Sequence, residues 1–376
     1  MELLEWARAH ERDTIALIRE MVELESPSDD PAALGCWAAW FCSRKFGKTS
    51  CSKDGHLICE LDLAGRRKAA GQILVLGHYD TVWPIGTLAR MSFRENSGRL
   101  LGPGVLDMKG GIALFLMAAR AVQELGIPVL RRVLLQLNAD EETGSRTSRA
   151  LTEKNARASR IALVLEPGAG LKGFLKTARK GVGAYELRVL GHAAHAGVDF
   201  AAGVSAVLEL SRQIAVIEKF TNIQRGVTVN PGVIGGGTRS NVIAAEAFAH
   251  IDVRVKRLVD AAILDRKFRG LKPFDRRCAL RLEGGLNRPP MERTKAIADL
   301  FRRARRLGAA LGIKLEESAT GGGSDGNFTA ALGVPTLDGL GAVGEGAHAD
   351  NESIFVDQIA PRTALLAALL AGLSED

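Results

Sequence analysis

The chain of 376 residues has few aromatic side chains and no long hydrophobic run. Aromatic residues make up only 5% of the sequence, so it offers no evident stacking platform for single-stranded nucleic acid. No stretch reaches the roughly 20 apolar residues of a membrane-spanning helix. The N-terminal segment Met1–Trp6 also lacks the basic start and apolar core of a secretory signal. We therefore expect a cytoplasmic protein with no nucleic-acid or membrane partner.

Cysteine occurs at only five positions, and no two of them form a C-x-x-C pair. An odd number argues against a complete disulfide framework, so we expect reduced thiols. The formal net charge of +7 permits an anionic partner, but the 50 basic residues are interspersed with 43 acidic ones. The densest basic run, Arg302–Arg306, falls in a helical pattern and indicates a solvated helix face. These features favour a small anionic substrate over a nucleic acid.

Short apolar runs predict a buried, mostly parallel sheet. The runs at 73–76, 133–137 and 161–165 are continuous and bounded by turn residues, as is typical of strands covered on both faces. A further short strand is predicted at 334–337. Apolar residues at three- and four-residue spacing predict helices at about 3–24, 112–125, 294–311 and 356–373.

The pattern of apolar and polar residues changes near residue 177. An alternating strand pattern at 184–190, an amphipathic helix pattern at 204–220 and another alternating pattern at 246–255 follow one another. Strands with one polar face beside a helix are typical of a small α+β unit. We therefore predict an α/β domain made of residues 1–176 and 289–376, into which a smaller α+β domain, residues 177–288, is inserted.

Three of the predicted strands end in residues that can bind a metal. His78 ends one strand and is followed by Asp80, which could hold the imidazole in one tautomer. Asp140, Glu141 and Glu142 follow the second strand, and Glu166 follows the third. Adjacent carboxylates are unfavourable unless a cation or a proton compensates them. Taken singly, His78 is more typical of a hydrogen-bonded turn residue, and the acidic cluster is more typical of a solvated turn.

Two more candidates lie in glycine-rich loops. Asp107 stands in Gly102–Gly111, just before a predicted helix, where a helix-capping role is the alternative. His348 lies in a late polar loop and could be an ordinary loop histidine. Together the candidates supply two imidazoles and three carboxylates, a set that suits two zinc-like ions sharing one carboxylate. Glu141 would then remain to act as a base towards water.

The predicted inserted domain has three candidate substrate contacts. His195 lies in the small-residue turn Gly191–Gly197, and Asn241 and Arg254 follow later. Two of them have a simpler interpretation, since His195 could be a surface residue and Arg254 could pair with a local carboxylate.

These motifs together resemble the M20 family of dinuclear zinc metallopeptidases, and most closely its glutamate carboxypeptidase branch. The resemblance covers nearly the whole chain, through the ordered motifs Gly77–Val82, Gly102–Gly111, Asp140–Ser145, Glu166-Pro167 and His348. It implies a zinc-peptidase-like α/β catalytic domain with a mostly parallel central sheet. It also implies that Asp107 bridges two Zn²⁺ ions, with Co²⁺ or Mn²⁺ as possible substitutes. His78 and Glu166 would complete one metal site, and Glu142 and His348 the other.

The same resemblance implies further roles around the metal pair. Glu141 would be the general base, Asp80 would orient His78, and a cis peptide bond would follow Asp107. The inserted domain would serve as a lid or dimerisation domain in a homodimer. His195 would stabilise the oxyanion in a partner subunit's site, and Arg254 with Asn241 would bind the substrate's terminal carboxylate.

The sequence-based hypothesis is thus zinc-dependent hydrolysis of an amide next to a free carboxylate, as in a carboxypeptidase releasing C-terminal glutamate. An N-acyl-amino-acid deacylase or desuccinylase is the alternative within enzymes, because the same metal chemistry would serve it. A non-catalytic amino-acid or peptide binder is the alternative from another class.

Overall fold

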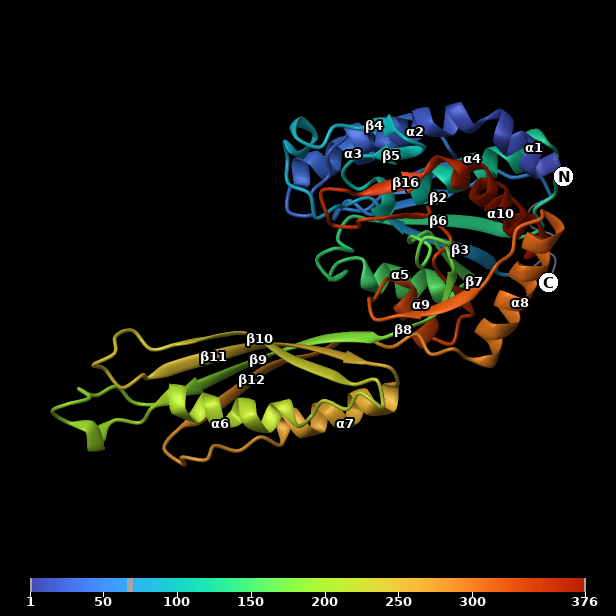
Figure 1. Cartoon of the computed structure of the whole chain (residues 1–376). Coiled ribbons are helices and arrows are strands. Elements are labelled where there is room, and N and C mark those ends of the chain that lie inside the picture. The colour runs from blue at the N-terminus through green and yellow to red at the C-terminus, as the bar shows by residue number, and fades with distance from the viewer. Residues whose placement is uncertain (1, 66–69, 375–376) are drawn as a thin grey trace. The chain divides into compact units, whose positions relative to one another are not determined.

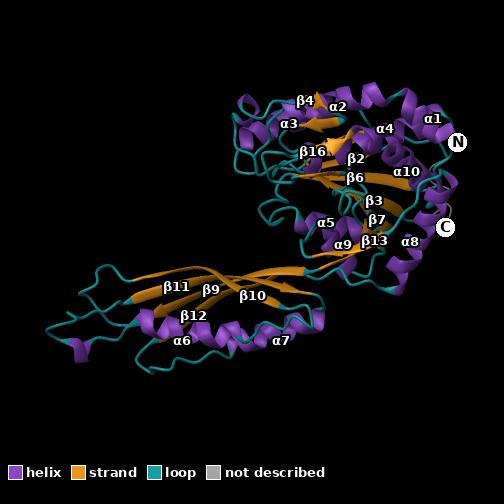
Figure 2. Ribbon diagram, viewed as in Figure 1, coloured by secondary structure: helices purple, strands orange, loops and turns teal. Residues whose placement is uncertain are grey.

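The computed structural model describes residues 2–65 and 70–374. The chain forms two compact units, each drawn in Figure 1 and coloured by secondary structure in Figure 2. Unit 1 comprises Met1–Ala178, Arg293–Thr320 and Ser324–Asp376, and unit 2 comprises Arg179–Glu292 and Gly321–Gly323. The second unit is therefore an insertion, and its main segment begins and ends within a few residues of the expected 177–288.

Unit 1 is built on a six-stranded sheet with the order β1-β2-β6-β3-β7-β14. Strands β6, β3, β7 and β14 are parallel, whereas β1 and β2 form an antiparallel edge. The strands span β1 Lys48–Cys51, β2 Leu57–Glu60, β3 Gln72–His78, β6 Arg132–Asn138, β7 Ser159–Val164 and β14 Thr336–Leu337. The expected α/β fold with a mostly parallel central sheet is confirmed.

Helices cover both faces of this sheet (Figure 2). The side chains of Val75 and Leu135 face one large core with α1, α2, α4, α8 and α10, whereas Leu74 and Val164 face a smaller cluster that includes Ala156 of α5. This alternation explains why the strands are apolar throughout. The helices span α1 Glu2–Ala9, α2 Glu11–Glu23, α3 Pro31–Ser43, α4 Gly110–Glu124, α5 Arg149–Arg157, α8 Lys295–Ala310, α9 Gly326–Ala331 and α10 Ile359–Gly372.

Two small sheets complete unit 1. One has the order β15-β16-β5-β4, and the other pairs β13 with β8. Their strands span β4 Arg94–Asn96, β5 Arg99–Leu101, β8 Leu175–Arg179, β13 Glu317–Thr320, β15 Gly344–Glu345 and β16 Ser353–Phe355. In the first of these sheets, β16 pairs with β5. The segment before α10 therefore lies next to the loop that joins β5 to α4.

Unit 2 is an antiparallel sheet of order β10-β11-β9-β12 covered by two helices. Alternate residues of β9 and β11, such as Leu187 and Ile251, pack against the helices, and this is the alternation that the sequence predicted. The elements span β9 Gly181–Leu190, α6 Ala206–Glu218, β10 Thr228–Gly236, β11 Glu246–Val255, α7 Leu258–Arg269 and β12 Ala279–Arg288.

Two element boundaries differ from the sequence-based expectation. The helix expected at 3–24 is interrupted at His10, whose ψ of 19° leaves the helical range and whose ring stacks on Trp6. The strand expected at 334–337 is reduced to β14, because Pro335 has no N–H to donate and contributes only its carbonyl oxygen to Ala162. Among the described residues, no helix is both long and apolar enough to cross a membrane.

Candidate metal centre

The candidate ligands gather at the carboxyl edge of the central sheet. Strand β3 lies between β6 and β7, and all three run in the same direction. His78 therefore ends β3 beside the loop that follows β6, and Glu166 follows β7 on the other side. Asp107 comes from the loop before α4, and His348 from the loop between β15 and β16.

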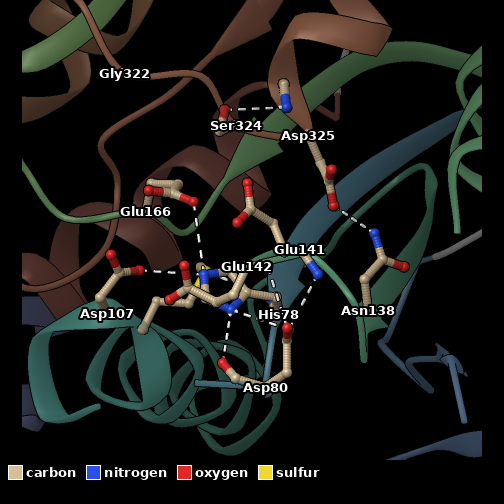
Figure 3. A network of polar contacts seen from close by, with 12 residues as sticks. His78, Asp80, Asp107, Asn138, Glu141, Glu142, Glu166, Gly322, Ser324 and Asp325 are labelled. Atoms are coloured by element: carbon tan, nitrogen blue, oxygen red, sulfur yellow. Dashed lines mark hydrogen bonds and ion pairs between the residues drawn. The ribbon is translucent and has the colours of Figure 1, made fainter. Parts of the chain in front are cut away.

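Asp107 stands between the two imidazoles (Figure 3 shows its partner His78). Its Oδ1 lies 3.1 Å from Nε2 of His78, and its Oδ2 lies 3.3 Å from Nε2 of His348. Nε2 of His78 is also 3.7 Å from Oε1 of Glu166, and Nε2 of His348 is 3.1 Å from Oε1 of Glu142. The side chains thus form two groups of three that share Asp107, each with its ligating atoms within 4.8 Å of one another.

The carboxylates make this cluster a cation-binding environment. Burial lowers the pKa of His78, but hydrogen bonds to Asp107 and Asp80 outweigh it and hold that pKa well above its ordinary value. Contacts with Asp107 and Glu142 raise the pKa of His348 to about 10. Burial raises the pKa of Asp107, yet the two imidazoles outweigh it and hold it well below its usual range. The carboxylates therefore attract positive charge to this cluster, either as protons on the two imidazoles or as a bound metal ion.

The donor set fits two divalent metal ions. Two imidazole nitrogens and three carboxylates are the ligand types that zinc prefers, and each group of three leaves a position for water or substrate. Asp107 offers one oxygen to each group, so it can bridge the ions. His78, Asp107 and Glu166 would hold one ion, and Asp107, Glu142 and His348 the other.

Asp80 links the histidine ligand to the acidic loop. Its carbonyl oxygen lies 3.0 Å from Nδ1 of His78, and its carboxylate oxygen lies 3.4 Å from the same atom. Its carboxylate also accepts the backbone N–H groups of Glu141 and Glu142, at 3.2 and 3.1 Å. Asp80 thereby leaves Nε2 of His78 to face the ligand cluster and fixes the start of the acidic loop.

Glu141 lies beside the cluster without belonging to either group of three. Its side chain is buried, and its charge contributes to the raised pKa of His78. In Figure 3 it points towards Glu166. Its neighbour Asp140 has a different role, because its carboxylate accepts the backbone N–H groups of Thr147 and Ser148 and so closes the loop.

Sequence reasoning missed Glu352. This fully buried carboxylate accepts the backbone N–H groups of Gly104, Leu106 and Asp107 and the indole N–H of Trp83, at 2.8 to 3.0 Å. It therefore fixes the backbone of the shared ligand from a position four residues after His348. The peptide bond after Asp107 is cis, as the family resemblance implied. The available signal was an acidic residue shortly after His348. The local sequence did not show whether Glu352 or Asp350 has the supporting role.

In unit 2, the structure brings His195 and Asn241 together. The carbonyl oxygen of Asn241 accepts the backbone N–H of Ala196, and both side chains are exposed. Nδ1 of His195 accepts the backbone N–H groups of Gly197 and Val198, at 3.1 and 3.2 Å. Since an accepting nitrogen carries no proton, the proton of the neutral ring is on Nε2. His195 therefore presents an N–H donor to the solvent.

Arg254 lies at the other end of the same sheet. Glu246, at the end of β11 near Asn241, pairs with Leu190, whereas Arg254 pairs with Val182. Eight residues of strand at about 3.3 Å each separate Glu246 from Arg254 by about 26 Å. Within one chain, Asn241 and Arg254 therefore do not converge on one small ligand. The guanidinium of Arg254 pairs with Asp252 through two hydrogen bonds of 2.9 Å.

Comparisons of the sequence with known proteins identify its family. The model of Peptidase family M20/M25/M40 matches residues 74–372. Carboxypeptidase G2 of Pseudomonas sp. (strain RS-16) is 29% identical over 327 residues, which cover 85% of this chain and 78% of that protein. Acetylornithine deacetylase of Salmonella arizonae is 34% identical over 207 residues, which cover 51% of this chain and 52% of that protein.

Solved structures share the fold. Aminopeptidase PepT from Bacillus cereus superposes with a TM-score of 0.78 at 21% identity, over 97% of this chain and 99% of that chain. The Bacillus subtilis YXEP protein, a dinuclear metal binding peptidase from the M20 family, gives a TM-score of 0.71 at 13% identity, over 98% and 99% of the two chains.

Proposed function

The chain belongs to peptidase family M20/M25/M40 and is a hydrolase; from this premise we propose that it is a two-zinc exopeptidase that cleaves an amide next to a free carboxylate. The observation that carries the proposal is the pair of three-residue groups that share Asp107, with Glu141 beside them. Glu141 is a buried carboxylate that belongs to neither group of three, and the proposal gives it the role of base, which a protein that only bound peptides would not need.

When bound, the two ions would polarise the scissile carbonyl and make the attacking water more acidic. The chain's own residues perform the proton transfers. Glu141 takes a proton from the attacking water and passes it to the leaving nitrogen, so the C–N bond breaks as an amine departs. Its burial removes competing water and keeps the carboxylate directed at the reacting atoms. Asp80 and Glu352 hold the ligands while this happens.

We assign His195 and Arg254 to the substrate. The N–H on Nε2 of His195 would donate to the oxyanion of the tetrahedral intermediate, for which a neutral donor held by two backbone N–H groups is well suited. Arg254 would bind the terminal carboxylate as a bidentate donor, exchanging part of its pairing with Asp252. Asn241 lies with His195, so we place it near the scissile group instead of with Arg254.

The separation of about 26 Å along β11 supports a site shared by two chains. One small substrate cannot touch both ends of one sheet, so His195 and Arg254 would reach it from different copies. A homodimer, in which unit 2 serves for dimerisation, meets this requirement.

For the substrate we favour an N-acylated or peptide-linked C-terminal glutamate, because carboxypeptidase G2 aligns over most of the chain. N-acyl-amino-acid deacylation is the second candidate, supported by the likeness to acetylornithine deacetylase over about half of the chain. A panel of N-acyl-glutamates, dipeptides and N-acetylated basic amino acids, tested with zinc-loaded protein, separates them. Release of free glutamate supports the first, and hydrolysis confined to the N-acetylated basic amino acids supports the second.

A further inference from the structure

The glycine-rich segment before α9 has no part in the mechanism described above, yet it contacts the loop that carries Glu141 and Glu142. Its buried residue Asp325 faces Asn138 and Ser145, the two residues on either side of that loop. One carboxylate oxygen accepts the side-chain amide of Asn138 at 2.5 Å, and the other accepts the hydroxyl of Ser145 at 2.5 Å. Figure 3 shows the first of these contacts.

The usual role for an aspartate at this position does not account for the contact. Asp325 is the N-cap residue of α9, where an aspartate ordinarily accepts helix N–H groups with its side chain. Its side chain makes no such capping bond, and the carboxylate is directed to the acidic loop instead. The side chain thus connects two separate segments of unit 1.

The carboxylate of Asp325 contacts both ends of the acidic loop. Asn138 is the last residue of β6. Ser145 has a positive φ of 57°, a backbone conformation that residues other than glycine rarely adopt. The loop between them is internally closed, since Ser145 donates its N–H to the carbonyl oxygen of Asp140. Fixing both ends therefore fixes the directions of Glu141 and Glu142.

The segment that carries Asp325 is itself well anchored. Oγ of Ser324 donates to Asp338 at 2.7 Å, and the side chain of Asn327 accepts the N–H of Ser324 at 2.9 Å. Ser324, Asn327 and Asp338 are all fully buried. Asp325 is therefore presented from a rigid support.

We propose that Asp325 is a positioning residue that clamps both ends of the acidic loop, so that the base Glu141 and the metal ligand Glu142 keep their places. The inference rests on the proposed function for the roles of those two glutamates. Partners of this kind, one step removed from a metal site, typically change activity or metal affinity by about 10- to 100-fold.

The test compares Asp325→Asn with the reciprocal double variant Asn138→Asp/Asp325→Asn. In the single variant, two amide side chains face each other, and we expect kcat to fall about 10- to 100-fold with KM changed less than about threefold. In the double variant, the amide at position 325 can donate to the carboxylate at 138 and its oxygen can accept from Ser145. We expect this exchange to restore kcat to within about threefold of the parent.

A matched control is Thr329→Val, a buried change on α9 that removes the hydrogen bonds to the carbonyl oxygen of Gly326 and to the hydroxyl of Thr336 without touching the acidic loop. It should leave kcat within about twofold of the parent. Ser145→Ala removes one of the two clamp contacts and should give a smaller loss of kcat, which tests the proposal even if Asp325→Asn folds poorly. Parental kcat in Asp325→Asn, or no recovery in the double variant, would overturn the clamp.

A second readout separates this inference from the proposed function. In protein loaded with Co²⁺, the visible absorption reports the ligand geometry even if no substrate is hydrolysed. We expect Asp325→Asn to change this spectrum or weaken the second Co²⁺ affinity, and the double variant to reverse the change. An unchanged spectrum and an unchanged Co²⁺ affinity in Asp325→Asn would contradict the clamp. If the spectrum of Asp325→Asn changes as expected but the parent hydrolyses no substrate, only the proposed reaction is refuted.

Discussion

The buried carboxylate of Glu352 accepts four N–H groups around the shared ligand, and its replacement by glutamine gives a sharp prediction. Each oxygen of Glu352 accepts two N–H groups, from Leu106 and Asp107 on one side and from Gly104 and Trp83 on the other. Because all four neighbours are donors, the ionised form is the one that fits. Glutamine keeps one accepting oxygen and turns an NH₂ group towards two donors.

The magnitude follows from the two lost contacts. A hydrogen bond to a charged group contributes about 1.5–3 kcal/mol, so Glu352→Gln should cost about 3–6 kcal/mol of unfolding free energy. For a unit of this size, that corresponds to a Tm lower by roughly 6–24 °C. Displacement of Asp107 should in addition weaken metal binding by about 10- to 100-fold.

The assay is thermal unfolding of parent and Glu352→Gln proteins, each with and without Zn²⁺. We expect a lower Tm without metal and a smaller rise in Tm on adding Zn²⁺. The control is Glu345→Gln in the same part of the chain, whose half-exposed carboxylate pairs with Arg99 and should contribute less than about 1 kcal/mol. If Glu352→Gln keeps the parental Tm and the parental response to Zn²⁺, the positioning role of Glu352 is wrong.

Three further predictions concern unit 2. Arg254→Ala should raise KM for N-acyl-glutamate at least about tenfold while hardly affecting hydrolysis of the matching α-amide, because the variant loses a partner for the terminal carboxylate. His195→Ala should lower kcat by about 10²–10³. Mixing and refolding it with Arg254→Ala should restore part of the activity, because a mixed dimer has one site with both residues intact. No recovery would contradict the shared site. Glu209→Gln should destabilise unit 2 by about 1–3 kcal/mol in denaturant unfolding, because the buried carboxylate accepts the backbone N–H groups of Phe274 and Asp275. Burial raises the pKa of Glu209, but hydrogen bonds from the side chain of Gln213 and from these two backbone N–H groups outweigh it and lower the pKa below that of the unfolded chain. The parent should therefore lose this contribution as the pH falls below about 4, and the variant should not.

The sequence predicted the parts of the centre that follow strand ends. His78, the acidic cluster and Glu166 each end an apolar run, and the shared direction of β6, β3 and β7 is sufficient to bring them to one edge. Asp107 and His348 come from loops, where no periodic pattern reports direction. Their assignment depended on the family resemblance, and the structure places Asp107 in both groups of three and His348 in one of them.

The supporting residues could not be predicted in the same way. Glu352 and Asp325 act through contacts with residues about 180 to 250 positions away, and their local sequences look like ordinary loops. The separation of Asn241 from Arg254 was likewise invisible, because it depends on the register of β11 against β9 and not on the identity of either residue. The interruption at His10 was missed because the apolar spacing of α1 and α2 is nearly continuous.

The central claim is that Glu141 is the base of a two-metal amide hydrolase. The most direct measurement determines bound zinc per chain and the rate of glutamate release from an N-acyl-glutamate for the parent and for Glu141→Gln. We predict two zinc ions in both proteins, and a kcat in the variant lower by about 10²–10⁴. Parental turnover in a fully loaded Glu141→Gln protein, or a parent that holds fewer than two ions when fully active, would contradict the account.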